Sequence, residues 1–318
     1  MKNIVVTYGD LNGIGFEIMV KALNALVLPI DKVKIVGSPK VFSYYDKNYN
    51  LKLKKDYEII DVELSENAFN IGKENVYSGE HCFLCLKKAC ELINNKKASS
   101  IVTAPVSKHV LNMAGHNFSG QTEVLEYFLA KKNEKSEMLF VANDFKILLL
   151  TRHIALNNIS KSITKKMIQD KIIRLNEVLI NSFNIKKPKI GLLALNPHAG
   201  ENGILGTEEI SIIKPAIHEL IKENINIEGP LVADAAFAKF GKCYFEKKPL
   251  PYDCYVAMYH DQGLIPMKLL AQDTAINTTI GLSAIRTSPS HGTAFDIAGK
   301  NIANANSMIE AIKLAIKI

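Results

Sequence analysis

The sequence contains no apolar run that approaches the roughly 18–20 residues needed to span a bilayer. Its first seven residues reach a Gly-Asp turn too early to form the core of a signal peptide. The five cysteines are an odd number at irregular positions, which argues against a secreted disulfide framework. We therefore expect a soluble, cytoplasmic protein with reduced thiols and no membrane partner.

Arginine is scarce, because only three of the 39 basic residues are arginine: Arg152, Arg174 and Arg286. A guanidinium group holds carboxylate or phosphate through two parallel hydrogen bonds, which lysine cannot do. Arg174 lies in a lysine-rich amphipathic segment, where we expect a solvated helix residue. The formal charge of +7 comes from lysines scattered among acids and asparagines. We therefore expect a small anionic ligand and no nucleic-acid partner.

The 318 residues, 47% of them hydrophobic, can bury a substantial core and suggest one large or two medium domains. Apolar runs of strand length alternate with helical patterns, which predicts an α/β protein with a largely parallel sheet. The predicted strands are Ile4 to Thr7, Val33 to Val36, Ser100 to Thr103, Ile147 to Leu150, Ile190 to Ala194 and Tyr255 to Met258. The predicted helices are Gly15 to Leu26, Glu80 to Asn94, Thr122 to Lys131, Ser162 to Phe183, Thr207 to Lys222 and Ala305 to Ile318.

Three of the eight histidines follow apolar strands closely: His153, His198 and His260. Ligands in such sheets bind beyond the carboxyl ends of the strands. Three imidazoles from different strands would form a divalent-metal site with positions open for substrate. The alternative is that these histidines cap loops or bind phosphate separately. Three other histidines lie in helical, charged surroundings and are expected at the surface: His81, His109 and His218.

Two aspartates accompany these loops. Asp234 and Asp261 could orient metal ligands or move protons, although Asp234 could instead be a helix N-cap. Cys82 and Cys85 form a CxxC pair, but their segment continues with apolar residues at helical spacing and the chain has no second CxxC. We expect these cysteines to pack in the core.

A dinucleotide-binding loop of the Rossmann type is absent, because the glycines of residues 9–15 do not fit the Gly-x-Gly-x-x-Gly spacing. Residues 288–300 are rich in small side chains that permit close backbone approach to a ligand. This segment resembles the nucleotide-binding loop of the isocitrate and isopropylmalate dehydrogenase superfamily, which binds NAD(P) without a Rossmann fold.

Further motifs resemble the 4-hydroxythreonine-4-phosphate dehydrogenase family over nearly the whole chain. The strongest are Asn-Pro-His-Ala-Gly-Glu at 196–201 and Met-Tyr-His-Asp-Gln-Gly at 258–263. The resemblance implies a two-domain α/β/α fold with the active site in the interdomain cleft at a dimer interface. It also implies a nucleotide-binding domain of residues 1–124 and 283–318, and a domain for metal, substrate and dimerisation of residues 125–282.

The resemblance assigns roles to matching positions. The implied ligands of zinc, magnesium or cobalt are His153, His198 and His260, drawn from both subunits of a homodimer. The implied catalytic residues are Asp234, Asp261 and Lys268. The implied contacts to a phosphorylated substrate are Gln121, Thr122, Lys268, Asn277 and Arg286. The implied NAD(P) contacts are His291, Gly292, Thr293, Ala294 and Asp296.

The implied activity is metal-dependent, NAD(P)-linked oxidation of 4-phosphohydroxy-L-threonine, followed by decarboxylation to 3-amino-1-hydroxyacetone 1-phosphate in pyridoxal phosphate biosynthesis. One departure affects the substrate, because Gln121 replaces the histidine of the family's Gly-His-Thr-Glu motif. A glutamine can donate hydrogen bonds to phosphate but cannot titrate, and the nearby His116 could compensate.

Three alternatives therefore stay open. A related phosphorylated sugar acid, 4-phosphothreonate or 4-phosphoerythronate, could be the substrate. A metal-dependent hydrolase or aldolase could use the same histidines, but it gives no reason for the 291–300 loop. A non-enzymatic phosphometabolite-binding protein would leave the three histidines without a task.

Overall fold

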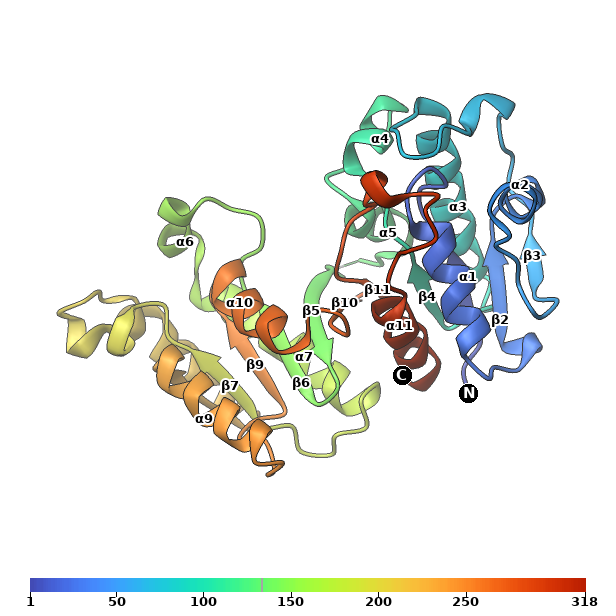
Figure 1. Cartoon of the computed structure of the whole chain (residues 1–318). Helices are drawn as coiled ribbons and strands as arrows, with labels where there is room; N and C mark the ends of the chain where they lie inside the picture. The colour runs from blue at the N-terminus through green and yellow to red at the C-terminus, as the bar shows by residue number, and fades with distance from the viewer. Residues whose placement is uncertain (133) are drawn as a thin grey trace. The chain divides into compact units, whose positions relative to one another are not determined.

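The computed structural model describes residues 1–132 and 134–318. The chain divides into two compact units, of which the first is discontinuous in sequence (Figure 1). Unit 1 consists of residues 1–136 and 273–318, and unit 2 of residues 137–272. None of the helices in the described part of the chain is long and apolar enough to cross a membrane.

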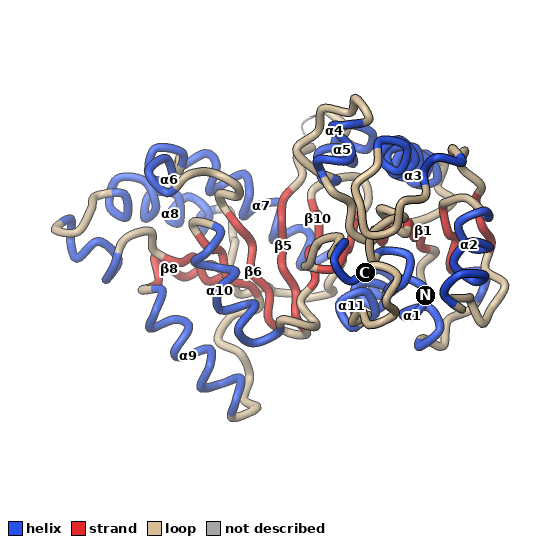
Figure 2. Tube along the Cα trace, turned by 45° about the horizontal axis from the view of Figure 1, so that its top comes forward, coloured by secondary structure: helices blue, strands red, loops and turns tan. Residues whose placement is uncertain are grey.

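Unit 1 contains strands in the order β3-β2-β1-β4-β11-β10. All neighbouring pairs are parallel except β10 and β11, which are antiparallel. The strands are β1 (Ile4–Thr7), β2 (Val33–Val36), β3 (Glu58–Ile60), β4 (Ser100–Thr103), β10 (Ile276–Ile280) and β11 (Ile285–Pro289). The α-helices are α1 (Gly15–Ala25), α2 (Pro39–Tyr49), α3 (Val76–Asn94), α4 (Lys108–Met113), α5 (Gln121–Leu129) and α11 (Asn306–Lys317). Helices α1 and α11 lie on one face of these strands, and α3, α4 and α5 on the other (Figure 2).

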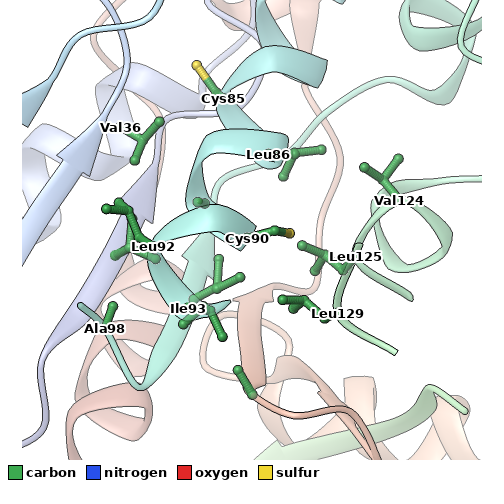
Figure 3. Packing of buried hydrophobic residues seen from close by; sticks show 14 of the residues in the cluster. Val36, Cys85, Leu86, Cys90, Leu92, Ile93, Ala98, Val124, Leu125 and Leu129 are labelled. Atoms are coloured by element: carbon green, nitrogen blue, oxygen red, sulfur yellow. The ribbon is translucent and has the colours of Figure 1, made fainter. Parts of the chain in front are cut away.

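The core beside α3 explains the cysteine pair. Cys82, Cys85 and Cys90 repeat at helical spacing and are at most 3% exposed. They belong to a cluster that also contains Leu125 and Leu129 of α5, and Figure 3 shows side chains of both helices in this packing. Burying a leucine-sized side chain contributes roughly 1.5–3 kcal/mol. The expected core role of the CxxC segment is confirmed.

Unit 2 contains strands in the order β5-β6-β9-β7-β8. The β5–β6 pair is antiparallel and the other pairs are parallel. The strands are β5 (Glu137–Ala142), β6 (Phe145–Leu149), β7 (Ile190–Leu193), β8 (Ile227–Leu231) and β9 (Cys254–Ala257). The α-helices are α6 (Leu156–Ser162), α7 (Lys165–Asn181), α8 (Lys214–Lys222), α9 (Ala233–Phe245) and α10 (His260–Ala271). Helices α7 and α8 cover one face and α9 and α10 the other (Figure 2).

The predicted α/β class and the largely parallel strand pairing are confirmed, and all six predicted strands form with bounds shifted by two residues at most. Five strands were missed: β3, β5, β8, β10 and β11. Three of them, β5, β10 and β11, belong to antiparallel pairs, and their short or evenly apolar sequences carry little alternation.

Two predicted surface residues are not solvated. His81 is 1% exposed, because its Nε2 lies 2.6 Å from the hydroxyl of Tyr8 and its Nδ1 lies 2.7 Å from Glu63 O. Burial lowers the pKa of His81, so the ring is neutral near pH 7. Arg174 is half-buried and donates from Nη2 to Glu137 Oε1 at 2.7 Å. Helical context alone did not reveal these partners, which come from distant elements.

Candidate active site

Two of the candidate histidines lie together in unit 2. His153 follows β6 and His260 begins α10 after β9, and the register pairs Leu149 with Ala257 at the carboxyl ends of these two strands. The rings of His153 and His260 are 5.8 Å apart between centroids. Both line a cavity of about 250 Å³ together with Arg152, Ile154, Leu156, Ile159, Tyr259 and Asp261.

Asp261 orients the ring of His260. Its Oδ1 lies 2.7 Å from His260 Nδ1, so Nδ1 is the donor, and in the neutral tautomer Nε2 is the nitrogen with the lone pair. Carboxylate–imidazole pairs of this kind fix the tautomer of metal-binding histidines and increase their basicity. The geometry therefore favours the orienting role among the two roles considered for Asp261.

Gln262 joins the loops after β7 and β9. Its Nε2 donates to Ala194 O at 2.8 Å, and its Oε1 accepts from Met258 N at 2.7 Å. Thr151, after β6, donates to Met258 O from its backbone N–H at 3.2 Å and from its hydroxyl at 2.7 Å. The loops that carry the three candidate histidines therefore leave neighbouring strands at one edge of unit 2.

His198 lies on a turn of unusual conformation. The backbone from His198 to Asn202 has positive φ throughout, with values of 52°, 54°, 76°, 43° and 56°. Left-handed helical geometry costs about 1–2 kcal/mol for each residue with a Cβ, so surrounding contacts must hold this turn. The side chain of His198 is exposed, and it is not among the residues that line the cavity.

The cavity brings together two of the three histidines expected to bind a divalent ion. Two imidazoles face one space, and the carboxylate of Asp261 fixes one of them with Nε2 unprotonated. Within residues 1–132 and 134–318, no group of three or more His, Cys, Asp or Glu side chains gathers closely enough to hold a metal. The structure therefore brings together His153 and His260, and it does not add His198 to them within one chain.

Arg286 provides a buried positive charge in unit 1. It is 5% exposed, and its Nε donates to Thr103 Oγ1 at 2.8 Å at the end of β4. Burial lowers the pKa of Arg286 to about 10, and the charge of Glu123 opposes this shift. The guanidinium is protonated at neutral pH, because this pKa stays well above 7. A buried guanidinium with its planar fork suits an anionic ligand.

Two amide side chains offer acceptors in the same unit. Gln121, the first residue of α5, donates from Nε2 to Ala104 O at 3.2 Å, which leaves its buried Oε1 without a hydrogen-bond partner. Asn277 on β10 also has a buried, unpartnered Oδ1. Thr122 is 7% exposed beside Gln121. His116, considered as a substitute for the family histidine, lies with its Nε2 2.7 Å from Glu80 Oε2.

Asp234 and Lys268 are both exposed. Asp234 lies in the first turn of α9, where its charge is favourable, but Val232 is the N-cap, so the N-cap alternative was wrong. Lys268 lies on α10 eight residues after His260, which is about 2.2 helical turns and leaves the two positions roughly 80° apart around the helix.

The expected cofactor loop packs against the early glycine loop. Ile14 N donates to Thr293 O at 2.9 Å, and a Cβ on Gly13 would lie 2.7 Å from the same oxygen. Ala294 has a φ of 42°, and His291 is exposed. The two loops therefore contact each other beyond the end of β1. Small residues are required there because the two backbones approach closely.

The family model described as pyridoxal phosphate biosynthetic protein PdxA matches residues 13–315. The chain belongs to the PdxA family. A PdxA-family relative from Sulfurihydrogenibium sp., a 4-hydroxythreonine-4-phosphate dehydrogenase, is 39% identical over 99% of this chain and 98% of its own length. A relative from Oceanobacillus iheyensis, described as a putative D-threonate 4-phosphate dehydrogenase, is 37% identical over 99% of this chain and 97% of its own. The crystal structure of 4-hydroxythreonine-4-phosphate dehydrogenase from Klebsiella pneumoniae matches with a TM-score of 0.87 and 33% identity, covering 99% and 97% of the two chains.

Sequence reasoning missed several residues that shape this PdxA-family site. Gln262 lies within the motif at 258–263, but the sequence pattern predicts no role for its side chain. Glu209 is 0% exposed and accepts hydrogen bonds from the segment that carries His198. Glu17 accepts from Ala303 N at 2.7 Å and so fixes the chain just after the cofactor loop. The only sequence signal for these residues is an acidic or amide side chain next to a ligand motif.

Proposed function

We propose that this protein oxidises 4-phosphohydroxy-L-threonine with NAD(P), and that the product loses carbon dioxide to give 3-amino-1-hydroxyacetone 1-phosphate for pyridoxal phosphate biosynthesis. The observation that carries the proposal is the facing pair His153 and His260, with His260 oriented by Asp261 at a common cavity. Membership of the PdxA family supports the reaction class, as does the similarity to relatives described as 4-hydroxythreonine-4-phosphate dehydrogenase and putative D-threonate 4-phosphate dehydrogenase.

A divalent metal such as zinc, cobalt or magnesium would be held by His153 and His260, with His198 as the third ligand. When bound, such an ion supplies a Lewis acid that lowers the pKa of a coordinated hydroxyl and stabilises negative charge after carbon dioxide is lost. Asp261 keeps Nε2 of His260 available for this role. Asp234 would be an additional carboxylate that accepts or donates a proton.

The chain's own residues bind and orient the substrate. Arg286 holds one anionic end through its buried guanidinium, and Lys268 holds the other. The orphaned oxygens of Gln121 and Asn277 accept hydrogen bonds from substrate hydroxyl or ammonium groups. Thr122 completes these contacts. Such positioning can contribute a large share of the rate when the reacting C–H bond is aligned with the nicotinamide ring.

The nicotinamide nucleotide is proposed to bind the loop that contains His291, Gly292, Thr293, Ala294 and Asp296. Its small residues support this assignment because they permit close backbone approach to a ligand. Its packing against residues 13–14 fixes the position of the loop. The division into a nucleotide-binding domain (residues 1–124 and 283–318) and a metal and substrate domain (residues 125–282) belongs to this proposal. The same proposal includes an isocitrate dehydrogenase-like cleft as the location of the site.

We also propose a homodimer that shares ligands between its subunits. Exposed apolar side chains in unit 2 support this, namely Leu156 (73%), Ile204 (79%), Ile265 (65%) and Leu269 (84%). Leu156 also lines the cavity beside His153 and His260, so a partner covering this surface would lie next to the site. The third ligand would then complete the set in the assembled dimer.

A phosphorylated sugar acid is the second candidate substrate. It is favoured by the similarity to the putative D-threonate 4-phosphate dehydrogenase. Gln121, which presents an acceptor in place of the family's histidine, is compatible with it. Both substrates offer donors to an acceptor, so the orientation of Gln121 does not choose between them by itself.

One assay tests the proposal. NAD(P)H formation is measured with 4-phosphohydroxy-L-threonine, 4-phospho-D-threonate and 4-phosphoerythronate, each with added zinc, cobalt or magnesium and with a chelator. The proposal expects the highest kcat/KM for the first substrate and loss of turnover with the chelator. Turnover of the sugar acids alone would establish the second candidate, and metal-independent turnover would reject the metal-assisted reaction.

A further inference from the structure

The left-handed turn of residues 198–202 is held at its beginning by one carboxylate. Glu209 is 0% exposed. Its Oε1 accepts from Leu195 N at 2.9 Å and from Asn196 N at 2.8 Å, and its Oε2 accepts from Asn196 Nδ2 at 2.9 Å. Both oxygens of the carboxylate thus accept hydrogen bonds from the two residues that precede Pro197 and His198.

The turn also packs directly against this carboxylate. A Cβ on Gly200 would lie 2.8 Å from Glu209 Oε2, so the glycine allows the close approach, and its φ of 76° places it in the left-handed region. The neighbouring residue Glu208 accepts a second hydrogen bond from Asn196 Nδ2 at 2.8 Å. A strained backbone persists only where surrounding contacts hold it, and here the contacts of Glu208 and Glu209 hold the turn.

We propose that Glu209 is a positioning residue that sets the direction of the His198 imidazole. The inference rests on the proposed function, in which His198 is a metal ligand. Glu209 fits this role because both of its oxygens accept hydrogen bonds, and the groups of Leu195 and Asn196 that face it are N–H donors. Replacement by glutamine would set an NH₂ group against the Asn196 amide, which removes one hydrogen bond and adds a repulsive contact while preserving shape.

The test measures the affinity of the full-length protein for zinc, by competition with a chromogenic chelator, without substrate or cofactor. The variants are Glu209→Gln, His198→Ala and the double variant. Partners of metal-binding histidines typically change affinity 10- to 100-fold when replaced, and we expect a loss of this size for Glu209→Gln. In the His198→Ala background, Glu209→Gln should cause no further loss, because its effect passes through that ring.

A matched control separates positioning from general stability. Glu137 is another buried carboxylate of unit 2, 2% exposed and paired with Lys171 and Arg174. Glu137→Gln should lower the melting temperature but leave zinc affinity unchanged. If Glu209→Gln does not fold, Gly200→Ala is used instead, because its Cβ would displace the turn from the same carboxylate.

Each outcome decides the inference. If His198→Ala weakens zinc binding, three results overturn the positioning role of Glu209. These are additive losses in the double variant, an equal loss of zinc affinity for Glu137→Gln, and unchanged zinc affinity for Glu209→Gln or for Gly200→Ala used in its place. Unchanged affinity in His198→Ala overturns it as well, and in that case the assignment of His198 as a ligand fails with it.

Discussion

Asp261 and His260 are adjacent in sequence, yet their side chains face each other with Oδ1 and Nδ1 2.7 Å apart. This contact leaves Nε2 of His260 as the nitrogen available beside His153. The first turn of α10 thus supplies both a ring and the group that fixes its tautomer.

Asp261→Asn removes the negative charge that orients His260. We expect a 10- to 100-fold decrease in zinc affinity and a similar decrease in kcat/KM. Titration with zinc and steady-state assays with saturating metal measure the two effects. Asp170→Asn, which alters only an exposed pair with Lys166, serves as the control and should change neither. Equal zinc affinity in Asp261→Asn and the wild type would contradict the orienting role.

Arg286→Met removes the buried cation at the end of β4. Hydrogen bonds to charged groups contribute about 1.5–3 kcal/mol, so KM for the phosphorylated substrate should rise about 10- to 100-fold. Arg286→Lys should recover only part of this loss, because lysine lacks the planar fork. Arg174→Lys is the matched control, since Arg174 pairs with Glu137 and should leave KM unchanged. A wild-type KM in Arg286→Met would show that the substrate's anion binds elsewhere.

Gln121→Met removes the acceptor that faces the proposed substrate, and KM should rise about 5- to 10-fold, as expected for one neutral hydrogen bond of about 1–1.5 kcal/mol. Gln121→Glu keeps an acceptor and should perform better than Gln121→Met if a substrate donor faces this position. If phosphate faces it, the added negative charge should make Gln121→Glu the worse of the two. KM profiles with each candidate substrate distinguish these results.

Asp10 makes stability depend on pH. Burial raises the pKa of this carboxyl from 3.8 to about 6, and its Oδ2 has no hydrogen-bond partner. Because the folded pKa lies above the unfolded one, the favourable contribution is fully present below pH 3.8 and is lost as pH rises through about 6. Asp10→Asn should therefore be more stable than the wild type at pH 7, by up to about 3 kcal/mol. Urea unfolding at pH 4 and pH 7 measures this, and an equal difference at both values would contradict it.

The buried thiols should resist alkylation. Burial raises the pKa of Cys82 and Cys85 well above the usual value, so little thiolate forms near pH 8. Cys243 is partly exposed and serves as the internal comparison. Mass spectrometry after iodoacetamide treatment of the native protein should show label on Cys243 first. Rapid labelling of Cys82 or Cys85 would contradict the core packing.

Strands β1 and β4 were predictable because four consecutive apolar or small residues precede a polar loop in each. The helical stripe around Cys82 and Cys85 was predictable for the same reason, since periodicity is a property of adjacent residues. The motifs at 196–201 and 258–263 indicate the family from sequence alone. The loops with candidate ligands were predictable because each one follows a predicted strand.

Strand order and side-chain direction were decided by tertiary structure. The neighbouring positions of β6 and β9 bring His153 and His260 together across more than a hundred residues, whereas the left-handed turn sets His198 apart from their cavity. The backbone oxygen of Ala104 accepts from Gln121 Nε2, and this leaves Oε1 as the unpartnered end of the side chain. Local sequence pattern sets which residues form strands and helices, but hydrogen bonds between distant segments depend on which strands become neighbours, and that is settled only when the whole chain packs.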